Sequence, residues 1–261
     1  MKKDLLDLTR QLRSRVEQSH QSDFAYSSGE REKSDSPLSE GSSKSVKPDS
    51  LGDQFGGKRA ALSNLSDVIA ACRKCPLGAQ RIRAVPGVGS PDAQVVFVGE
   101  GPGFEEDHRG EPFVGKSGQL LDRILESIGL SRQSVYIANI VKCHPMVEPS
   151  DPEKRGNDRP PTPEEIAACR GYLDEQLRLI GPRVIVTLGA VAARVLLGPG
   201  EPITRIRGQW RQYAPAGMDR PIRLLPTFHP AALLRNPTLK KDVWIDMKNL
   251  RAELGAAPEN P

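Results

Sequence analysis

The sequence has little of two things that mark particular protein classes: cysteine and long apolar runs. Only 4 of its 261 residues are cysteine, which is too few for a disulfide-based scaffold in a chain of this length. No run approaches the ~18 consecutive apolar residues that a membrane span needs. The N-terminal residues also lack the apolar core of a signal peptide. We therefore expect a cytoplasmic protein with no membrane partner, in which thiols are available to bind a metal.

Composition divides the chain near residue 55. Residues 21–50 contain ten Ser and few apolar side chains, so they cannot bury enough surface to offset the entropy of ordering. We expect residues 1–55 to form a flexible extension with room for a short helix, whose protein partner stays unknown. Residues 56–261 then form one folded domain, which carries 28 Lys and Arg against 23 Asp and Glu, a net charge of +5.

Strand-like and helix-like patterns alternate in the second part. Apolar runs of strand length lie at 95–98, 135–141, 184–188 and 222–225. Helical patterns lie at 120–128, ended by Gly129, at 163–180, with Thr162 as N-cap, at 190–197 and at 239–254. This alternation predicts an α/β fold, a three-layer αβα sandwich around a parallel sheet of about four strands. Ligands of such folds bind beyond the carboxyl ends of the strands.

The four cysteines come from separate segments. Cys72 and Cys75 form a C-x2-C pair at the end of a helical pattern, Cys143 follows a strand, and Cys169 lies within a helix. Thiolates that tie remote segments together suit zinc or an iron–sulfur cluster. The spacing matches neither a zinc ribbon nor a compact ferredoxin run. The residues alone thus favour a site in which all four thiolates bind a metal, and they leave the metal undecided. The alternative is a C-x2-C pair at the end of a helix, with the other two cysteines as unrelated buried thiols.

Polar and aromatic residues follow three of the predicted strands. The turn Gly99-Glu100-Gly101 lets a ligand approach the backbone, and Phe113 lies in a loop rich in Pro and Gly. Asn139 could hydrogen-bond the edge of a flat heterocycle, and His229 could stabilise a developing oxyanion. Each residue has a structural explanation when taken alone. Together at one sheet edge, in a basic domain, they predict a pocket for a nucleobase extruded from nucleic acid.

Four segments, in this order, carry a family resemblance: Gly-Glu-Gly-Pro-Gly-Phe-Glu-Glu-Asp (99–107), Pro-Phe-Val-Gly (112–115), Asn-Ile-Val-Lys-Cys (139–143) and His-Pro-Ala-Ala-Leu-Leu-Arg (229–235). With the cysteine spacing, and from about Leu62 to Leu250, the chain resembles the family-4 uracil-DNA glycosylases. The resemblance implies a monofunctional DNA repair enzyme that hydrolyses the N-glycosidic bond of deoxyuridine, releases uracil and leaves an abasic site. It also implies one 4Fe–4S cluster of structural role, held by Cys72, Cys75, Cys143 and Cys169.

The resemblance also implies roles by position. Phe113 would stack on the flipped uracil, Asn139 would hydrogen-bond its polar edge, and His229 would stabilise the leaving uracil anion. The Gly99–Gly101 turn would contact the base through its backbone. Gly101 stands where related families carry a water-positioning Asp, so Glu100 is the candidate for that role by proximity alone. Three further residues resemble the DNA wedge and a backbone contact: Leu233, Leu234 and Arg235.

The chain departs from the family in the loop after Cys143. The usual link to the next helix is short, whereas here Val147–Asp158 forms a longer loop that contains Lys154 and Arg155. An inert surface insertion and an added DNA contact are both open interpretations.

We expect a monomer acting on uracil-containing DNA, single- or double-stranded. The alternatives are a non-catalytic iron–sulfur or zinc protein that binds nucleic acid, or a glycosylase for another deaminated or damaged base.

Overall fold

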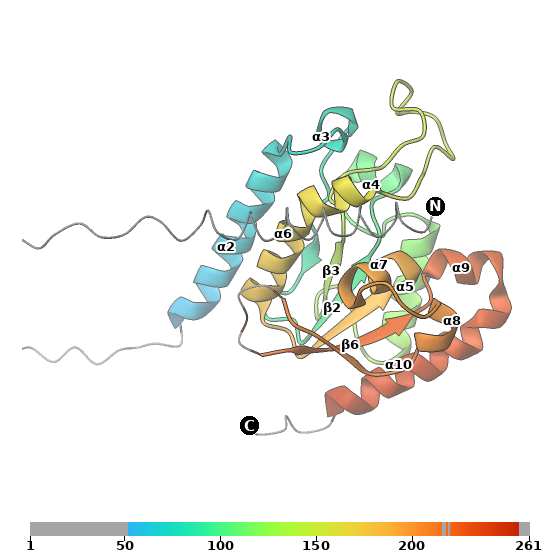
Figure 1. Cartoon of the computed structure of the whole chain (residues 1–261). Coiled ribbons are helices and arrows are strands. Elements are labelled where there is room, and N and C mark those ends of the chain that lie inside the picture. The colour runs from blue at the N-terminus through green and yellow to red at the C-terminus, as the bar shows by residue number, and fades with distance from the viewer. Residues whose placement is uncertain (1–51, 216–217, 219, 256–261) are drawn as a thin grey trace, which may run out of the picture. The chain divides into compact units, whose positions relative to one another are not determined.

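The computed structural model describes residues 52–215, 218 and 220–255 (Figure 1). Most of the predicted N-terminal extension, residues 1–51, lies outside the described residues, and so does its proposed short helix. The described chain begins with helix α2 (Gly52–Ala71), just before the predicted boundary at residue 56. No helix within these described ranges is long and apolar enough to cross a membrane.

The centre of the described part is a twisted sheet that confirms the predicted α/β fold. Its strands are β1 (Val88–Gly89), β2 (Val95–Gly99), β3 (Tyr136–Asn139), β4 (Val184–Leu188), β5 (Arg211–Tyr213) and β6 (Ile222–Thr227). The order is β1-β3-β2-β4-β6-β5, and the four central strands are parallel. Strands β1 and β5 add antiparallel edges that the sequence did not predict. They are two and three residues long, too short for an apolar pattern to mark them.

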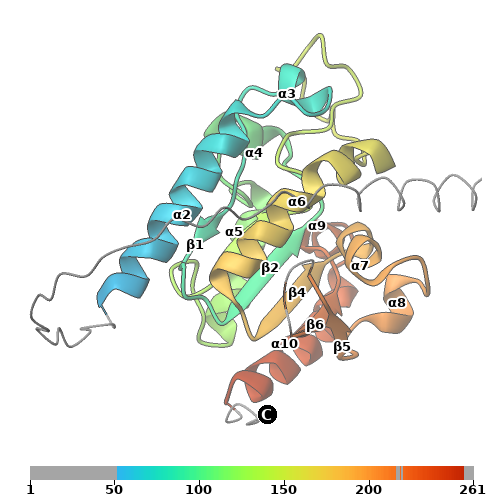
Figure 2. The ribbon, with the colours of Figure 1, turned by 60° about the vertical axis from the view of Figure 1, so that its left-hand side comes forward.

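Helices cover both faces of the sheet, which gives the predicted three layers (Figure 2). Val96 and Val98 of β2 pack toward the layer that contains α2, α6 (Pro163–Ile180) and α7 (Ala190–Leu197). Val95 and Phe97 pack toward α5 (Lys116–Ser127) and α10 (Lys240–Gly255). All five β2 residues are buried, because a parallel sheet between two helical layers has no solvated face.

Helix boundaries follow the predicted capping residues. The Thr162 hydroxyl accepts a hydrogen bond from the Glu165 N–H at 3.3 Å, which confirms it as the N-cap of α6. Gly129, with φ of +79°, follows α5 as predicted. Five short elements were not predicted because each spans less than two turns: α3 (Leu77–Gln80), α4 (Phe104–Arg109), α8 (Ile203–Ile206), α9 (Pro230–Arg235) and η1 (Pro237–Leu239).

Candidate active site

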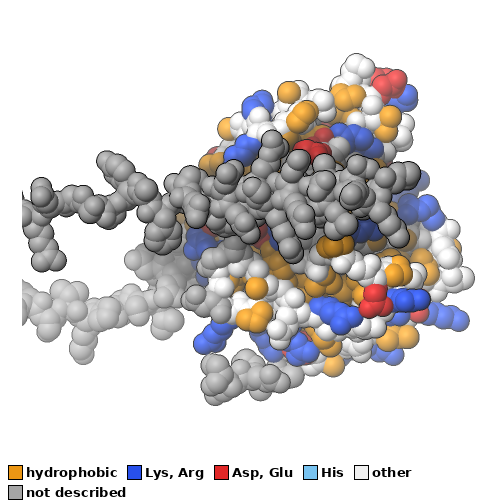
Figure 3. Space-filling view, in the orientation of Figure 1, with side chains coloured by type: hydrophobic (Ala, Val, Ile, Leu, Met, Phe, Trp, Pro, Cys, Tyr) orange, Lys and Arg blue, Asp and Glu red, His pale blue; other side chains and the backbone are white. Residues whose placement is uncertain are grey.

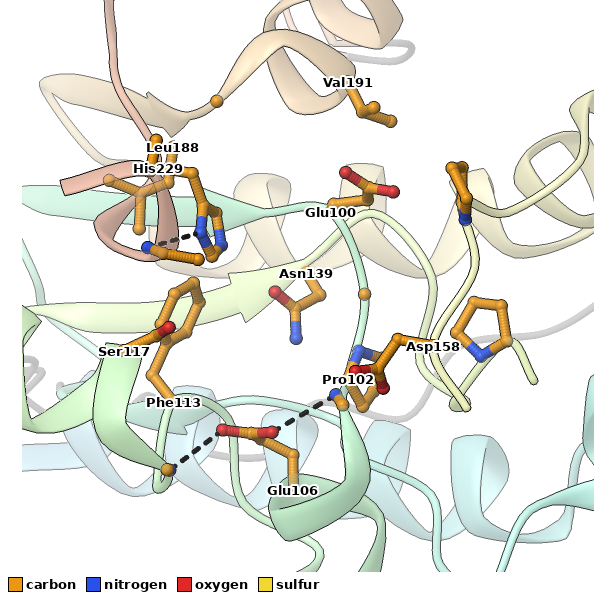
Figure 4. Close-up of a pocket in the computed structure, with 18 of the residues that line it drawn as sticks. Glu100, Pro102, Glu106, Phe113, Ser117, Asn139, Asp158, Leu188, Val191 and His229 are labelled. Atoms are coloured by element: carbon orange, nitrogen blue, oxygen red, sulfur yellow. Dashed lines mark hydrogen bonds between the residues drawn. The ribbon is translucent and has the colours of Figure 1, made fainter. Parts of the chain in front are cut away.

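A pocket of about 740 Å³ opens beyond the carboxyl ends of the parallel strands (Figure 4). Six of the residues that the sequence singled out line it: Glu100, Gly101, Phe113, Asn139, His229 and Arg235. They come from the ends of β2, β3 and β6, from the loop before α5 and, for Arg235, from the last residue of α9. The topology thus brings together segments that lie more than a hundred residues apart in the sequence.

Phe113 and His229 form one wall of the pocket. Their ring centroids are 5.5 Å apart with an interplanar angle of 32°, and only 5% of Phe113 is exposed. Phe113 has a φ of +56°. Among the residues that the structure describes, it is the one non-glycine residue with a positive φ. An aromatic residue in the left-handed region is strained and persists only where its surroundings fix it. Here Arg132 donates hydrogen bonds to the carbonyls of Pro112 and Phe113.

Glu106 is a site residue that sequence reasoning missed. Its Oε1 atom accepts hydrogen bonds from the N–H groups of Val114 at 2.9 Å and Gly115 at 3.1 Å, and its Oε2 accepts one from Gly103 at 3.2 Å. The carboxylate therefore joins the turn after β2 to the loop that carries Phe113 (Figure 4). The available signal was a Glu at the third position of a helix, a capping pattern, but α4 is too short for periodicity to reveal.

Asn139 lies at the floor of the pocket. It is 1% exposed, yet its Oδ1 atom has no hydrogen-bond partner in the described structure. Figure 4 shows its amide between Phe113 and His229 on one side and Glu100 on the other. An unpaired buried acceptor costs about 1–3 kcal/mol, so an orphan oxygen facing a pocket indicates a ligand that donates a hydrogen bond to it.

Gly99 leaves room for the side chains of Asn139 and Phe113, because it has no side chain of its own. A Cβ atom at this position would lie 2.4 Å from Asn139 Oδ1 and 2.6 Å from Cζ of Phe113. Any side chain there would displace both pocket residues. Gly99 is therefore required by the close approach of backbone to site.

His229 caps the N-terminus of α9. Its Nδ1 atom accepts a hydrogen bond from the Ala231 N–H at 3.1 Å, which leaves the ring proton on Nε2. Burial, assisted by the positive charge of Arg235, lowers the pKa of His229 to about 4. The imidazole is thus neutral at physiological pH and has a free Nε2–H donor in the pocket.

Glu100 and Gly101 differ in what they contribute. Burial raises the pKa of the Glu100 carboxyl, which extends into the pocket on the side of Val191 (Figure 4). A Cβ atom at Gly101 would lie 2.8 Å from Cγ2 of Val141. A larger side chain at 101 would therefore have to displace Val141, so Glu100 is the carboxylate that the turn can present.

The three residues predicted to contact the DNA at the wedge differ in their exposure to solvent. Leu233 is 1% exposed and packs in the core between the sheet, α5 and α10, so the prediction that it helps to wedge the DNA stack is corrected. Leu234 is 44% exposed and Arg235 is exposed at the pocket rim. One turn of α9 has a core side and a solvent side, and only Leu234 of the two leucines is on the solvent side.

The four cysteines meet at a second, smaller pocket, which Cys72, Cys75, Cys143 and Cys169 all line. No described group of three or more His, Cys, Asp or Glu side chains is arranged to hold a single metal ion. A zinc ion would hold each sulfur at about 2.3 Å and so draw the thiols into a tight tetrahedron. Four thiols that line one small space fit a four-thiolate site for zinc or for an iron–sulfur cluster.

Donors to the sulfurs support that fit. The Arg81 guanidinium donates a hydrogen bond to Cys143 Sγ at 2.8 Å, and the Lys142 N–H donates to Cys169 Sγ at 3.3 Å. Hydrogen bonds to sulfur are common around iron–sulfur clusters, where they tune the reduction potential. Burial raises the pKa of the Cys143 thiol to about 11, so a metal that binds this sulfur would have to displace its proton.

Comparison with known proteins agrees with this geometry. The profile of the uracil DNA glycosylase superfamily matches residues 86–248. A type-4 uracil-DNA glycosylase from Sulfurisphaera tokodaii is 41% identical over 76% of this chain and 87% of its own length. One from Thermotoga maritima is 44% identical over 72% and 92%. A type-5 uracil-DNA glycosylase from Thermus thermophilus is 32% identical over 49% and 68%. The chain therefore belongs to the uracil DNA glycosylase superfamily, among the type-4 uracil-DNA glycosylases.

Proposed function

We propose that this protein removes uracil from DNA by hydrolysing the N-glycosidic bond of deoxyuridine, which leaves an abasic site for base excision repair. The observation that carries the proposal is the set of unpaired polar atoms around Phe113. Asn139 offers an orphan acceptor and His229 offers an Nε2–H donor, both beside a ring on which a flat base can stack. Uracil has a ring N–H and carbonyl oxygens that complement these groups.

Each pocket residue then has one task. Phe113 stacks on the uracil, and Asn139 and the Gly99–Gly101 turn hydrogen-bond its edge. As the glycosidic bond stretches, negative charge moves onto the uracil, where the Nε2–H of His229 stabilises it. Water attacks the sugar carbon, and Glu100 is the carboxylate placed to orient that water. A neutral His229 suits this role because it needs no proton transfer to the leaving base.

The DNA backbone would lie across the pocket mouth. Leu234 would enter the base stack and Arg235 would contact a phosphate. Figure 3 shows one face of the described part, on which more Lys and Arg than Asp and Glu side chains are visible. A basic surface of this kind supports attraction to the DNA backbone.

We assign one 4Fe–4S cluster to Cys72, Cys75, Cys143 and Cys169. When bound, the cluster supplies a structural cross-link between the end of α2, the segment after β3, and α6. Cys143 follows Asn139 on the same segment, and the Lys142 ammonium between them donates a hydrogen bond to the Asn139 carbonyl at 2.8 Å. The cysteine site thereby supports the position of Asn139. Iron and sulfide analysis of the protein, with Cys169→Ser as control, tests the assignment.

We further propose two functional parts, the extension at residues 1–55 and a catalytic domain at residues 56–261, in a monomeric cytoplasmic enzyme. One chain holds every pocket residue assigned to the proposed chemistry, so the reaction requires no residue of a second subunit. Sedimentation of the full-length protein tests the oligomeric state.

Single-turnover cleavage tests the function. A labelled oligonucleotide with one deoxyuridine is incubated with excess protein and then treated with alkali, which breaks the strand at abasic sites. We expect a cut at the uracil and none in the matched thymine strand. If the uracil strand stays intact with protein that contains its full complement of iron, the proposed function is wrong.

A further inference from the structure

The long loop Val147–Asp158 packs on helix α4 through three side-chain contacts. Arg155 Nη1 donates a hydrogen bond to Glu105 Oε1 at 2.8 Å, and the guanidinium lies over the Phe104 ring, 4.6 Å from its centroid. Glu153 Oε2 lies 3.1 Å from Nε2 of His108. Inside the loop, the Asn157 amide donates to the carbonyls of Glu148 and Asp151. These contacts place the Arg155 side chain against α4, beside the pocket.

The same pocket that holds the predicted uracil site extends to this loop. Phe104, Glu105, Arg155 and Asp158 line it together with Phe113, Asn139 and His229. Figure 4 places Asp158 beyond Asn139, on the side away from Phe113 and His229. A volume of about 740 Å³ leaves room for more than one pyrimidine. The pocket therefore has a second part that the excised base does not use.

Arg155 presents a flat surface in this second part. One face of its guanidinium lies on the Phe104 ring, and 75% of its side chain is exposed, so the other face is open to solvent. Guanidinium and aromatic planes are the surfaces on which unstacked bases settle. Glu105 already compensates the charge of Arg155, which favours a neutral base over a phosphate as the ligand.

We propose that Phe104 and Arg155 form a second nucleobase site, at which a base next to the excised uracil stacks on the open face of the Arg155 guanidinium. The site deepens the proposed function and rests on it, because a neighbouring base is delivered there only when the uracil enters the Phe113 site. The loop then selects the strand conformation in which uracil and its neighbour are both unstacked.

The test measures binding with and without the neighbouring base. Short single-stranded oligonucleotides carry a central 2′-fluoro-deoxyuridine, whose glycosidic bond resists cleavage, and either intact neighbours or an abasic nucleotide on the 5′ or the 3′ side. Dissociation constants are measured by fluorescence anisotropy. The variants are Arg155→Lys, which keeps the charge and loses the plane, Arg155→Ala, and Lys154→Ala as a control. Lys154 pairs with Glu148 and does not line the pocket.

We expect Arg155→Lys and Arg155→Ala to weaken binding of the intact strand about 5-fold, and binding of one of the two abasic strands less than about 2-fold. Lys154→Ala should bind all strands like the wild type. Equal losses on all three strands, or a loss in Arg155→Ala that Arg155→Lys restores, would indicate a phosphate contact and overturn the proposal, as would no loss at all. Cleavage of an unmodified deoxyuridine strand by the wild type tests the proposed function separately.

Discussion

The Nδ1 atom of His229 accepts a hydrogen bond from the backbone N–H of Ala231 at 3.1 Å. This contact joins the end of β6 to the first turn of α9 and selects the tautomer with its proton on Nε2. The adjacent proline at 230 sets the backbone for the helix start, since its missing N–H needs no partner there. A single local cap thus determines which atom of the imidazole faces the pocket.

Replacing His229 should slow the chemical step more than DNA binding. His229→Ala removes the Nε2–H donor, and loss of one such donor typically lowers the rate about 10²–10³-fold. Single-turnover cleavage gives the rate, and anisotropy with the 2′-fluoro strand gives the affinity, which we expect to change less than about 3-fold. A rate like that of the wild type would remove His229 from the chemistry.

The stability of the protein should fall in mild acid because of His229. Its pKa is about 4 in the folded state and about 6.5 when unfolded, so the unfolded chain binds the extra proton first. The His229 contribution is complete above pH 6.5 and is lost as the pH falls toward 4, about 2 kcal/mol at pH 5. Urea unfolding at pH 7 and pH 5 measures it. His229→Gln should show a smaller loss of stability between these pH values; an equal loss would contradict the assignment.

Gly99→Ala should damage the site while leaving the fold intact. The new methyl group would meet Asn139 Oδ1 and the Phe113 ring at contact distances no real Cβ shows, so both side chains must move. We expect cleavage to fall by more than about 10-fold, because misplaced catalytic groups lose their orientation. Gly171→Ala is the matched control, since a Cβ on that helical residue meets nothing within 4 Å. The control should keep full activity and melt at the same temperature or higher.

Asn139→Asp should reduce the preference for uracil. A carboxylate is nearly isosteric with the amide but donates no hydrogen bond, and the wild-type Oδ1 already lacks a protein partner. We expect a drop of about 10²-fold or more in kcat/KM for the uracil strand, because a buried polar site that is left unpaired rejects its ligand strongly. Competition between uracil and cytosine strands in one tube measures the selectivity, because these two bases differ in the polar edge that Asn139 faces, whereas thymine differs from uracil only by a methyl group. Unchanged selectivity would show that Asn139 does not read the base.

The sequence alone determined the layers and the residues at the strand ends. Buried parallel strands have continuous apolar sequences, so the strands at 95–98 and 184–188 could be predicted without any tertiary information. Capping residues lie next to the helices that they cap, so Thr162 could be predicted in the same way. The family segments then identified Phe113, Asn139 and His229, which the fold gathers in one pocket. These features are local, and local patterns are what a linear sequence records.

Only the tertiary structure decided the features that depend on contacts between distant segments. The short edge strands β1 and β5 exist because longer neighbours offer them partners. Leu233 and Leu234 are adjacent and chemically identical, and packing alone placed the first in the core and left the second exposed. Glu106 joins two loops, and Arg155 reaches Phe104 from a loop some fifty residues away. Such contacts have no periodic signature in the sequence, because they arise from the relative placement of segments in space after the sheet has formed.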